Sequence, residues 1–451
     1  MKIEILNPIE CRVGAALATI IRPCLSYTAV TYVQGPYRKI RKEYQKSTMT
    51  RDDEGNFYFY TGCLRRVLNY CHEKNVPVSV SGVEEKLDAG KFSLRTLTLR
   101  EEQVRLVEAA LKAGRGVIKA PTGIGKTAIG LAIISAYKDA KVLWLCHTKD
   151  LMYQAGGVCE KELGEKVGYL GDGNSDLSHR ITMATRQSFI KVAADYGHLY
   201  DIVIVDETHH ISSLTGQYAD ILTNVFSPVR IGLTATLPTD QEATLAIESF
   251  IGPLIDEVTV AEGQELGIMA DIKIKFLKLP ISYKIKDLRR YQDVYEWGVV
   301  KREAQHRLVA ETVRNHIGRG DSVLIIVNRI EHGNLLLETI KGVGISCYFA
   351  RGDTDSELRK EIKEALNNKD IHCVIATTIW KEGVDLPELN VIINAAGGKS
   401  EIGTLQAIGR GLRLTKTKRQ LILYDIFDPS NNFLISHFGE RLCLYSDMNW
   451  I

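Results

Sequence analysis

The chain has 451 residues, enough for about three domains that each bury a core of their own. Its 45% hydrophobic and 25% charged residues are typical of a globular protein, and a formal net charge of +2 excludes a surface that is basic throughout. Nine cysteines, an odd number with no CxxC pair, argue against a disulfide framework or a structural zinc site and favour a reducing compartment.

The first 95 residues differ in composition from the rest. They mix aromatic and basic residues ("YVQGPYRKIRKEYQK") and contain a hairpin-like "DDEGNFYFYTG". We expect residues 1–95 to form a small α+β accessory domain. The most apolar early stretch is interrupted by Arg22 and Pro23, so we expect no membrane span, no membrane partner and a cytoplasmic location.

From Leu97 onward, short β-branched runs alternate with helix-like stretches. Near-continuous hydrophobic strands separated by helices predict a parallel sheet covered on both faces. We expect one such domain over residues 96–255, a connection over 256–300 and a second such domain over 301–451. The runs are "GVIKA", "KVLWLCH", "ITMAT", "DIVIVDE" and "RIGLTAT" in the first domain, and "SVLIIVN", "ISCYFA", "HCVIATT", "VIINAA" and "QLILYDI" in the second. The predicted fold class is therefore α/β.

The stretch "APTGIGKT" follows the run "GVIKA" and precedes a helix-like segment, which is the context of a phosphate-binding loop. Glycines there let backbone N–H groups turn toward phosphate oxygens at a positive helix N-terminus. Lys126 would reach the β and γ phosphates of ATP, and the Thr127 hydroxyl would hold Mg²⁺. The whole predicted loop is Ala120, Pro121, Thr122, Gly123, Ile124, Gly125, Lys126 and Thr127.

Asp206 and Glu207 end the apolar run "IVIVD", at the edge where open parallel sheets bind ligands. Asp206 could order Mg²⁺, while Glu207 could orient and deprotonate the water that attacks the γ-phosphate. The alternative is that the two acids only begin the next helix, where its dipole favours them.

In "QAIGRGLR", Gln406, Arg410 and Arg413 share one helical face. Such a face is commonly just solvated. The alternative is that Arg410 and Arg413 stabilise charge on the transferring phosphoryl group.

Taken together and in order, these motifs resemble those of the superfamily 2 helicases and translocases, from about Leu97 to Tyr424. "LREEQ" resembles the segment before motif I, and the resemblance implies that Arg100 and Gln103 contact the nucleotide. The further matches are "HTKDLMYQ" (Ia), "ATRQSF" (Ib), "DETH" (II), "TAT" (III), "VNRIEHG" (IV), "ATTIWKEGVDLP" (V) and "QAIGRGLR" (VI). The resemblance implies two tandem RecA-like domains.

The resemblance also implies roles for individual residues, each of which could instead be an ordinary loop or strand-end residue. His209, Thr234 and Thr236 would couple the ATP site to the nucleic-acid site, and Gly383 and Asp385 would lie near the nucleotide. Positions matching contacts to a sugar–phosphate backbone are Thr148, Lys149, Thr185, Arg186, Gln187, Asn328, Arg329, Thr377 and Thr378. Hydroxyls, amides and cations suit backbone binding without base readout.

Two positions depart from the family pattern. Thr208 stands where the DEAD and DEAH subgroups carry alanine, and Trp380 is unusual within motif V. Because Asp206 and Glu207 remain, hydrolysis is still expected, but neither RNA-associated subgroup is matched.

The compact layout resembles the UvsW-type helicases encoded by phages, which implies ATP-driven remodelling of branched DNA in recombination, replication or repair. Lys39 and Arg41, close to Tyr37 and Tyr44, would form a duplex or junction grip, or else a solvated basic surface. The alternatives are an RNA helicase, the motor of a restriction-type translocase, and an ATP-gated binding protein without motor activity. A monomer in a bacterial host cytoplasm is compatible with the sequence.

Overall fold

The computed structural model describes residues 1–34, 39–82, 87–121, 123–351, 354, 356–377, 386, 388–398, 420–447 and 450–451. These residues form two compact units. The first comprises Met1–Ala120 and Gly125–Val258, and the second comprises Pro121–Ile124 and Thr259–Ile451. Within the described residues, no helix is both long and apolar enough to cross a bilayer.

The N-terminal part of the first unit is a small sheet with two helices, as expected. The strands lie in the order β5-β6-β2-β1-β7; neighbours are antiparallel except β7, which runs parallel to β1. The apolar face buries Ile3, Phe59 and Val67. The elements are β1 (Lys2–Ile5), β2 (Glu10–Val13), α1 (Ala15–Ile21), η1 (Arg22–Leu25), β5 (Thr50–Arg51), β6 (Phe57–Tyr60), η2 (Thr61–Cys63), α2 (Leu64–Glu73) and β7 (Ser79–Ser81).

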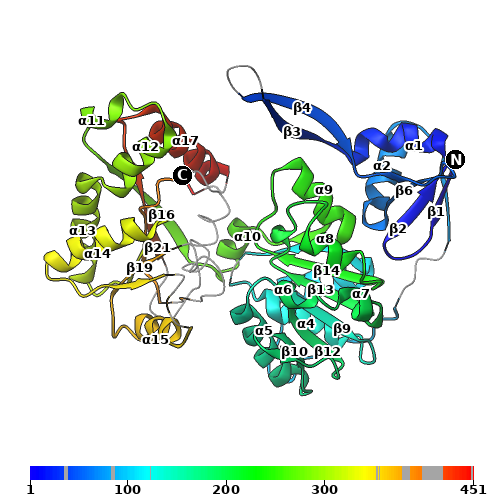
Figure 1. The fold of residues 1–451 in the computed structure, drawn as a ribbon. Coiled ribbons are helices and arrows are strands. Elements are labelled where there is room, and N and C mark those ends of the chain that lie inside the picture. The colour runs from blue at the N-terminus through cyan, green and yellow to red at the C-terminus, as the bar shows by residue number, and fades with distance from the viewer. Residues whose placement is uncertain are drawn as a thin grey trace. The chain divides into compact units, whose positions relative to one another are not determined.

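A two-stranded ribbon leaves this small domain (Figure 1). It consists of β3 (Ser26–Gln34) and β4 (Lys39–Ser47), paired antiparallel from Ser26 opposite Ser47 to Gln34 opposite Lys39. The side chains of residues 41–46 are exposed on both faces of the ribbon. At its base, the hydroxyl of Tyr27 donates to Glu242 over 3.0 Å.

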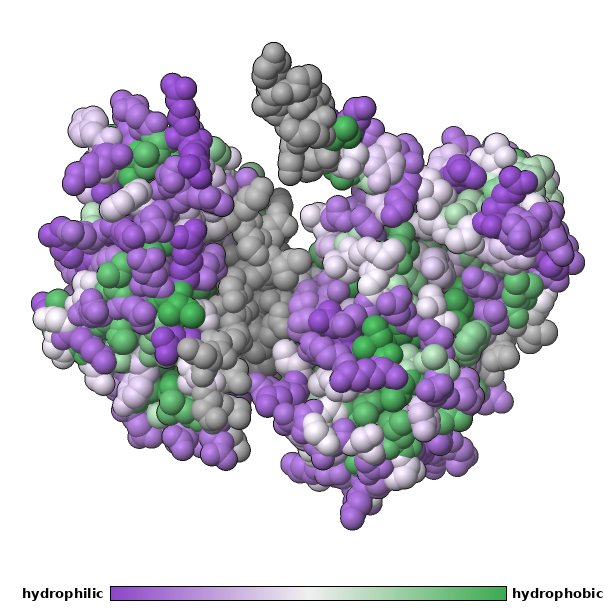
Figure 2. All heavy atoms as spheres, viewed as in Figure 1, coloured by the Kyte–Doolittle hydropathy of each residue, from purple (hydrophilic) through white to green (hydrophobic). Residues whose placement is uncertain are grey.

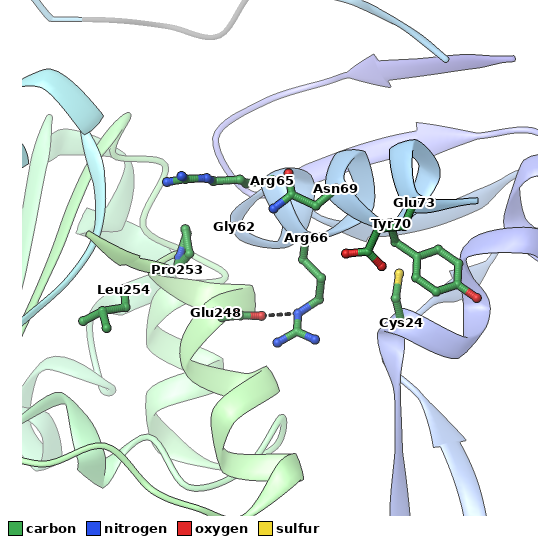
Figure 3. A pocket seen from close by; sticks show the side chains of 10 residues that line it. All are labelled: Cys24, Gly62, Arg65, Arg66, Asn69, Tyr70, Glu73, Glu248, Pro253 and Leu254. Atoms are coloured by element: carbon green, nitrogen blue, oxygen red, sulfur yellow. Dashed lines mark hydrogen bonds and ion pairs between the residues drawn. The ribbon is translucent and has the colours of Figure 1, made fainter. Parts of the chain in front are cut away.

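The N-terminal domain is fixed closely against the large sheet domain of the same unit (Figure 3). A Cβ at Gly62 would overlap the carbonyl oxygen of Glu248, so only glycine allows this approach. Beside it, Arg66 forms an ion pair with the Glu248 carboxylate. A cavity of about 390 Å³ remains between the two parts, lined by residues such as Asn69 and Leu254.

The large sheet of the first unit has the order β11-β10-β12-β9-β13-β14-β8-β15 and is parallel except for β11. Its central strands are fully buried, which explains their near-continuous apolar runs. The strands are β8 (Arg115–Lys119), β9 (Val142–Cys146), β10 (Gly168–Gly171), β11 (Asn174–Ser175), β12 (Ile181–Thr185), β13 (Ile202–Asp206), β14 (Val229–Thr234) and β15 (Leu254–Glu257). The helices are α3 (Glu101–Ala113), α4 (Lys126–Ser135), α5 (Lys149–Leu163), α6 (Arg186–Phe189), α7 (Ala193–Tyr196), η3 (Gly197–Leu199), η4 (Thr208–His210), α8 (Gln217–Leu222) and α9 (Gln241–Phe250).

The sheet of the second unit is parallel throughout, in the order β16-β21-β20-β17-β19-β18. Its edge strand β16 comes from the stretch that the sequence indicated as a connection, and it pairs with β21 along its whole length. The strands are β16 (Asp271–Lys278), β17 (Val323–Ile326), β18 (Tyr348–Ala350), β19 (Cys373–Ala376), β20 (Val391–Asn394) and β21 (Gln420–Phe427). The helices are α10 (Val260–Glu265), α11 (Tyr283–Lys286), α12 (Tyr291–Tyr295), a π-helix (Glu296–Val300), α13 (Glu303–Ile317), α14 (Ile330–Gly342), α15 (Ser356–Asn367) and α17 (Asn432–Asp447).

The fold class is confirmed: two parallel α/β sheets follow a small domain with antiparallel pairing. In parallel sheets the carboxyl ends of neighbouring strands meet at one edge, where ligands bind. In the first unit that edge brings together the residues that follow β12, β9, β13, β14 and β8.

Candidate functional site

The predicted phosphate loop lies between β8 and α4. Gly123 and Gly125 have φ values of +99° and +90°, which favour glycine, and Gly125 directly precedes the first turn of α4. A Cβ on Gly125 would lie 2.6 Å from the side-chain nitrogen of Gln103. The loop therefore presents backbone N–H groups at the N-terminus of a ten-residue helix, as a phosphate site requires.

Gln103 is buried against this loop. Its Oε1 atom accepts a hydrogen bond of 2.9 Å from the backbone N–H of Arg100, which leaves its Nε2 atom facing Gly125. The segment before α3 is held by the buried Glu162, whose carboxylate accepts hydrogen bonds from the Thr96 and Leu97 N–H groups at 2.9 and 3.0 Å. Glu162 was not identified from the sequence, because an acid within a helix carries no local signal of such a role.

Lys126 and Glu207 point toward one another across the loop. Lys126 Nζ lies 3.9 Å from Glu207 Oε1 and 3.5 Å from the carbonyl oxygen of Ala120. The predicted phosphate-binding lysine and the predicted base therefore face one another at the end of the sheet.

Asp206 and Glu207 are brought together at the end of β13. Burial and then the negative charge of Glu207 raise the pKa of Asp206 to about 7, while Lys126 opposes the shift. Glu207 has a φ of +50°, which is uncommon for a residue other than glycine, and its N–H donates to Asp206 Oδ1 over 3.0 Å. Local strain of this kind is commonly found at functional sites.

The three predicted coupling residues form one chain of contacts. His209 Nδ1 lies 3.4 Å from Glu207 Oε2 and 3.0 Å from Thr234 Oγ1. The Thr234 hydroxyl in turn donates to the carbonyl oxygen of Thr236 over 2.7 Å. The end of β13 is thus linked through side chains to the segment that follows β14.

Thr208, which stands where the DEAD and DEAH subgroups carry alanine, has a structural explanation. Its hydroxyl lies at hydrogen-bond distance from two carbonyl oxygens, that of Val205 at 2.8 Å and that of Leu233 at 3.2 Å. A Cβ on Gly232 would lie 2.6 Å from that hydroxyl. The larger side chain therefore occupies space that Gly232 leaves open.

The residues of the first unit that are predicted to contact a nucleic-acid backbone lie at the carboxyl ends of β9 and β12, which are neighbours in the sheet. Thr148 caps α5 by accepting from the Leu151 N–H at 3.4 Å, and the exposed Lys149 lies 3.0 Å from Asp172. Thr185 is buried, whereas the Arg186 guanidinium lies 5.4 Å from the centre of the Tyr218 ring. Gln187 is exposed at the start of α6.

The residues of the second unit that are predicted to contact a nucleic-acid backbone follow β17 and β19, which are also neighbours in their sheet. Asn328 is exposed, and Arg329 pairs with Glu296 over 2.7 Å. Thr377 is buried and its N–H donates to Ala350 over 3.2 Å.

Seven predicted site residues and one departure lie outside the described residues. They are Thr122, Thr378, Gly383, Asp385, Gln406, Arg410 and Arg413, with Trp380 as the departure. The role of the two arginines in charge stabilisation stays a prediction.

On the ribbon, Arg41 is exposed and pairs with Glu43 over 2.6 Å, and Lys39 stands opposite Gln34 in the strand register. Glu43 was not considered in the sequence analysis. Its carboxylate offsets part of the positive charge that was expected there.

Comparisons with known proteins place both parallel-sheet regions of the chain in families of the helicase kind. Residues 96–239 match the family described as "Type III restriction enzyme, res subunit", and residues 302–415 match "Helicase conserved C-terminal domain". The chain is 29% identical to the DNA 3'-5' translocase XPB2 of Sulfurisphaera tokodaii over 402 residues, 80% of this chain and 88% of that protein. It is 22% identical to the ATP-dependent DNA helicase uvsW of Enterobacteria phage T4 over 370 residues, 74% of this chain and 72% of that protein.

Among solved structures, the chain is similar to the ATP-dependent type ISP restriction-modification enzyme LlaBIII bound to DNA. The TM-score is 0.59 with 18% identity, covering 78% of this chain and 30% of that one. At this identity the likeness concerns the fold.

Proposed function

The chain belongs to the superfamily 2 helicases, and we propose that it is a DNA-stimulated ATPase motor that remodels branched or forked DNA. The two matched families lie in the order that a helicase motor has, one in each parallel-sheet region. The protein is accordingly an ATP-dependent enzyme of the helicase kind. Its DNA substrate and its action on branched structures are the proposal.

The observation that carries the proposal is the shared sheet edge of the first unit. The ends of β8, β13 and β14 hold Lys126, Asp206 and Thr234, and the ends of β9 and β12 hold Thr148 and Arg186. Candidate ATP and strand contacts therefore stand on adjacent strands of one rigid layer. Any shift of these strand ends on ATP hydrolysis would move the strand contacts as well.

The donor set at this edge fits ATP with Mg²⁺. Gly123, Gly125 and Lys126 would hold the phosphates, while Thr127 and the carboxylate of Asp206 would hold the metal ion. Bound Mg²⁺ would neutralise charge on the phosphate oxygens. Glu207, fixed by its backbone conformation and close to His209, would orient a water molecule and accept its proton.

DNA rather than RNA is proposed because two relatives that each match about three quarters or more of this chain, a translocase and a helicase, carry DNA in their names. The N-terminal domain and its ribbon would add contacts specific to a junction or a fork. Exposed cations such as Arg41 and Lys42, near the exposed ring of Tyr44, suit phosphates together with base or duplex-end stacking.

ATP hydrolysis at fixed salt is the first test, with single-stranded DNA, linear duplex, a four-way junction, a fork and single-stranded RNA of equal nucleotide content. Salt is fixed because phosphate contacts make affinity fall steeply with it. Strongest stimulation by the junction or the fork supports the proposal. Stimulation by RNA above DNA would identify an RNA helicase, and DNA cleavage by the purified protein would identify a restriction-type enzyme.

The ribbon's part is tested by reversing its charge with Lys39→Glu and Arg41→Glu together. We expect weaker junction binding and a shallower salt dependence. Each lost phosphate contact lowers the slope of the logarithm of the binding constant against the logarithm of the salt concentration by about one unit. The matched control is Arg65→Glu, an exposed-face arginine on α2 that lies beside the cavity in Figure 3. An unchanged affinity and slope in the ribbon variant would remove the ribbon from the binding surface.

A further inference from the structure

Three large aromatic side chains of the second unit remain exposed on α12, the π-helix and α17. Tyr291 and Phe433 are in ring contact, and Trp297 follows Glu296, the ion-pair partner of the predicted strand contact Arg329. Tyr291, Trp297 and Phe433 have 38%, 55% and 39% of their surface exposed. None of the helicase motifs includes them. Exposed aromatic groups that cluster on a folded surface commonly mark a binding site, because water contact with such rings is unfavourable.

The scaffold under these rings is well packed. Helix α12 runs directly into the π-helix, and Val294, Val299 and Leu434 form a buried cluster that joins both to α17. The Tyr291 ring lies 5.8 Å from that of Phe433, centre to centre. π-helical turns occur frequently at functional sites. The exposed rings are therefore held in place by a core rather than carried by a loose loop.

This surface adjoins the predicted strand contacts Asn328 and Arg329. The guanidinium of Arg329 lies 4.9 Å from the centre of the Tyr295 ring, which lies 5.8 Å from that of Tyr291. Arg329 also pairs with Glu296, the first residue of the π-helix. A nucleic-acid strand that touches Arg329 would thus have exposed aromatic rings within one or two side chains of its backbone.

The surrounding charge favours a polyanion. The Lys301 ammonium lies 5.3 Å from the centre of the Trp297 ring, although the carboxylates of Glu296 and Glu331 pair with it and offset part of its charge. Exposed cations also stand on the segment before α12, where Asn431 fixes the chain by donating to the carbonyl oxygens of Ile285 and Leu288. Those cations are Lys284, Lys286, Arg289 and Arg290, against the exposed acid Asp287 and, at the start of α12, Asp293, which lies 3.6 Å from Arg290.

We propose that Tyr291, Trp297 and Phe433, here called the aromatic strip, stack on unpaired bases of the strand whose backbone Asn328 and Arg329 contact. This deepens the proposed function and rests on it. Every base has a π face, so such a surface would hold single strands without reading their sequence. The positive surroundings favour nucleic acid over an apolar protein partner as the occupant.

The test is binding of Trp297→Ala to a single-stranded DNA oligonucleotide and to one of equal length that carries abasic sites in its central region. One lost stacking contact weakens binding about fivefold or more, so we expect that loss for the intact strand and none for the abasic strand. Trp297→Phe keeps an aromatic face and should bind nearly as the unchanged protein does. Phe226→Ala is the matched control. Phe226 is 45% exposed and precedes β14, so it lies at the amino ends of the strands of the first sheet, away from the carboxyl ends that carry the candidate site.

The outcomes separate this inference from the proposed function. Equal weakening of both strands, or no weakening of either, in Trp297→Ala would overturn the stacking role while DNA stimulation of ATP hydrolysis persists. A change of sedimenting mass in the variant, with DNA binding unchanged, would assign the strip to a protein interface instead. Absence of stimulation by any nucleic acid in the unchanged protein would remove the proposed function itself. The same comparison with single-stranded RNA tells whether the strip also takes RNA bases.

Discussion

His209 Nδ1 and Thr234 Oγ1 lie 3.0 Å apart and join the end of β13 to the end of β14. The hydroxyl of Thr234 has one hydrogen, which it donates to Thr236, so the hydrogen shared with His209 belongs to the imidazole. The same Nδ1 atom faces Glu207 at 3.4 Å. The imidazole is therefore held between the candidate base and the segment after β14.

We expect Thr234→Val to uncouple the two sites, because valine keeps the shape but removes the acceptor. ATP hydrolysis without DNA should stay within a few fold, while stimulation by DNA falls about tenfold, in the usual range of coupling free energies. Steady-state hydrolysis with and without DNA measures the ratio. Thr223→Val is the control, since that hydroxyl donates only to helix carbonyls. A preserved stimulation ratio would contradict the coupling role.

Lys126→Ala and Glu207→Gln should each lower kcat for ATP hydrolysis about 100-fold or more, since each removes a charge that the proposed mechanism places at the reacting phosphate. Phosphate release at saturating ATP is the measurement. Binding of a non-hydrolysable ATP analogue is the control for Glu207→Gln, which leaves the phosphate loop intact. Residual hydrolysis by Glu207→Gln above about a tenth of the original rate would show that another group acts as the base.

Gly232 and Thr208 should be energetically coupled. Gly232→Ala forces a methyl group against the Thr208 hydroxyl in a buried layer and should lower the free energy of unfolding by about 1–3 kcal/mol. In a Thr208→Ala background the same change should cost about 1 kcal/mol less, because the clash is relieved. Urea unfolding of the four proteins measures both values. Simple additivity would mean that the strands shift to accept the methyl group.

Acid should destabilise the second unit through His332. Burial, and then the charge of His306, lower the pKa of His332 to about 3. The unfolded chain binds this proton near pH 6.5, so the stability is full above that pH and is lost as the pH falls toward the folded value. The loss at pH 5 is about 2 kcal/mol by linkage.

His332→Leu removes this titration and nearly preserves the volume. Thermal unfolding at pH 7 and pH 5 should show a smaller acid shift in the variant than in the unchanged protein. Equal shifts in both would mean that water or a partner reaches the imidazole.

Much of the fold could be predicted because its central strands are buried on both faces. The runs at Ile202 and Val323 are apolar at almost every position, and they form β13 and β17 as expected. Edge strands escape this signal. β16, with Asp271 and Lys275 among its residues, is half exposed and reads as a charged connection until its pairing with β21 is seen.

The site could be predicted to the extent that it is local. The phosphate loop and Asp206–Glu207 are short segments with chemistry of their own, and the structure brings them together. Glu162 and the pairing of Tyr291 with Phe433 depend on residues distant in the chain, so no local pattern indicates them. Glu43 pairs with Arg41 only two positions away, but the surrounding cations hide it in the sequence. The close contact between Gly232 and Thr208 also has no local signal, because 23 residues of the chain separate the two positions.

The tight approach at Gly62 also has a mechanical meaning. The backbone at Gly62 leaves no room beside the Glu248 carbonyl, and the Tyr27 hydroxyl is hydrogen-bonded to the Glu242 carboxylate. We therefore expect the N-terminal domain and α9 to move together. The paired ribbon then behaves as a stiff lever whose nine-residue arms extend about 30 Å. A rotation of the first sheet by about five degrees would move the far end of a 30 Å arm by about 2–3 Å.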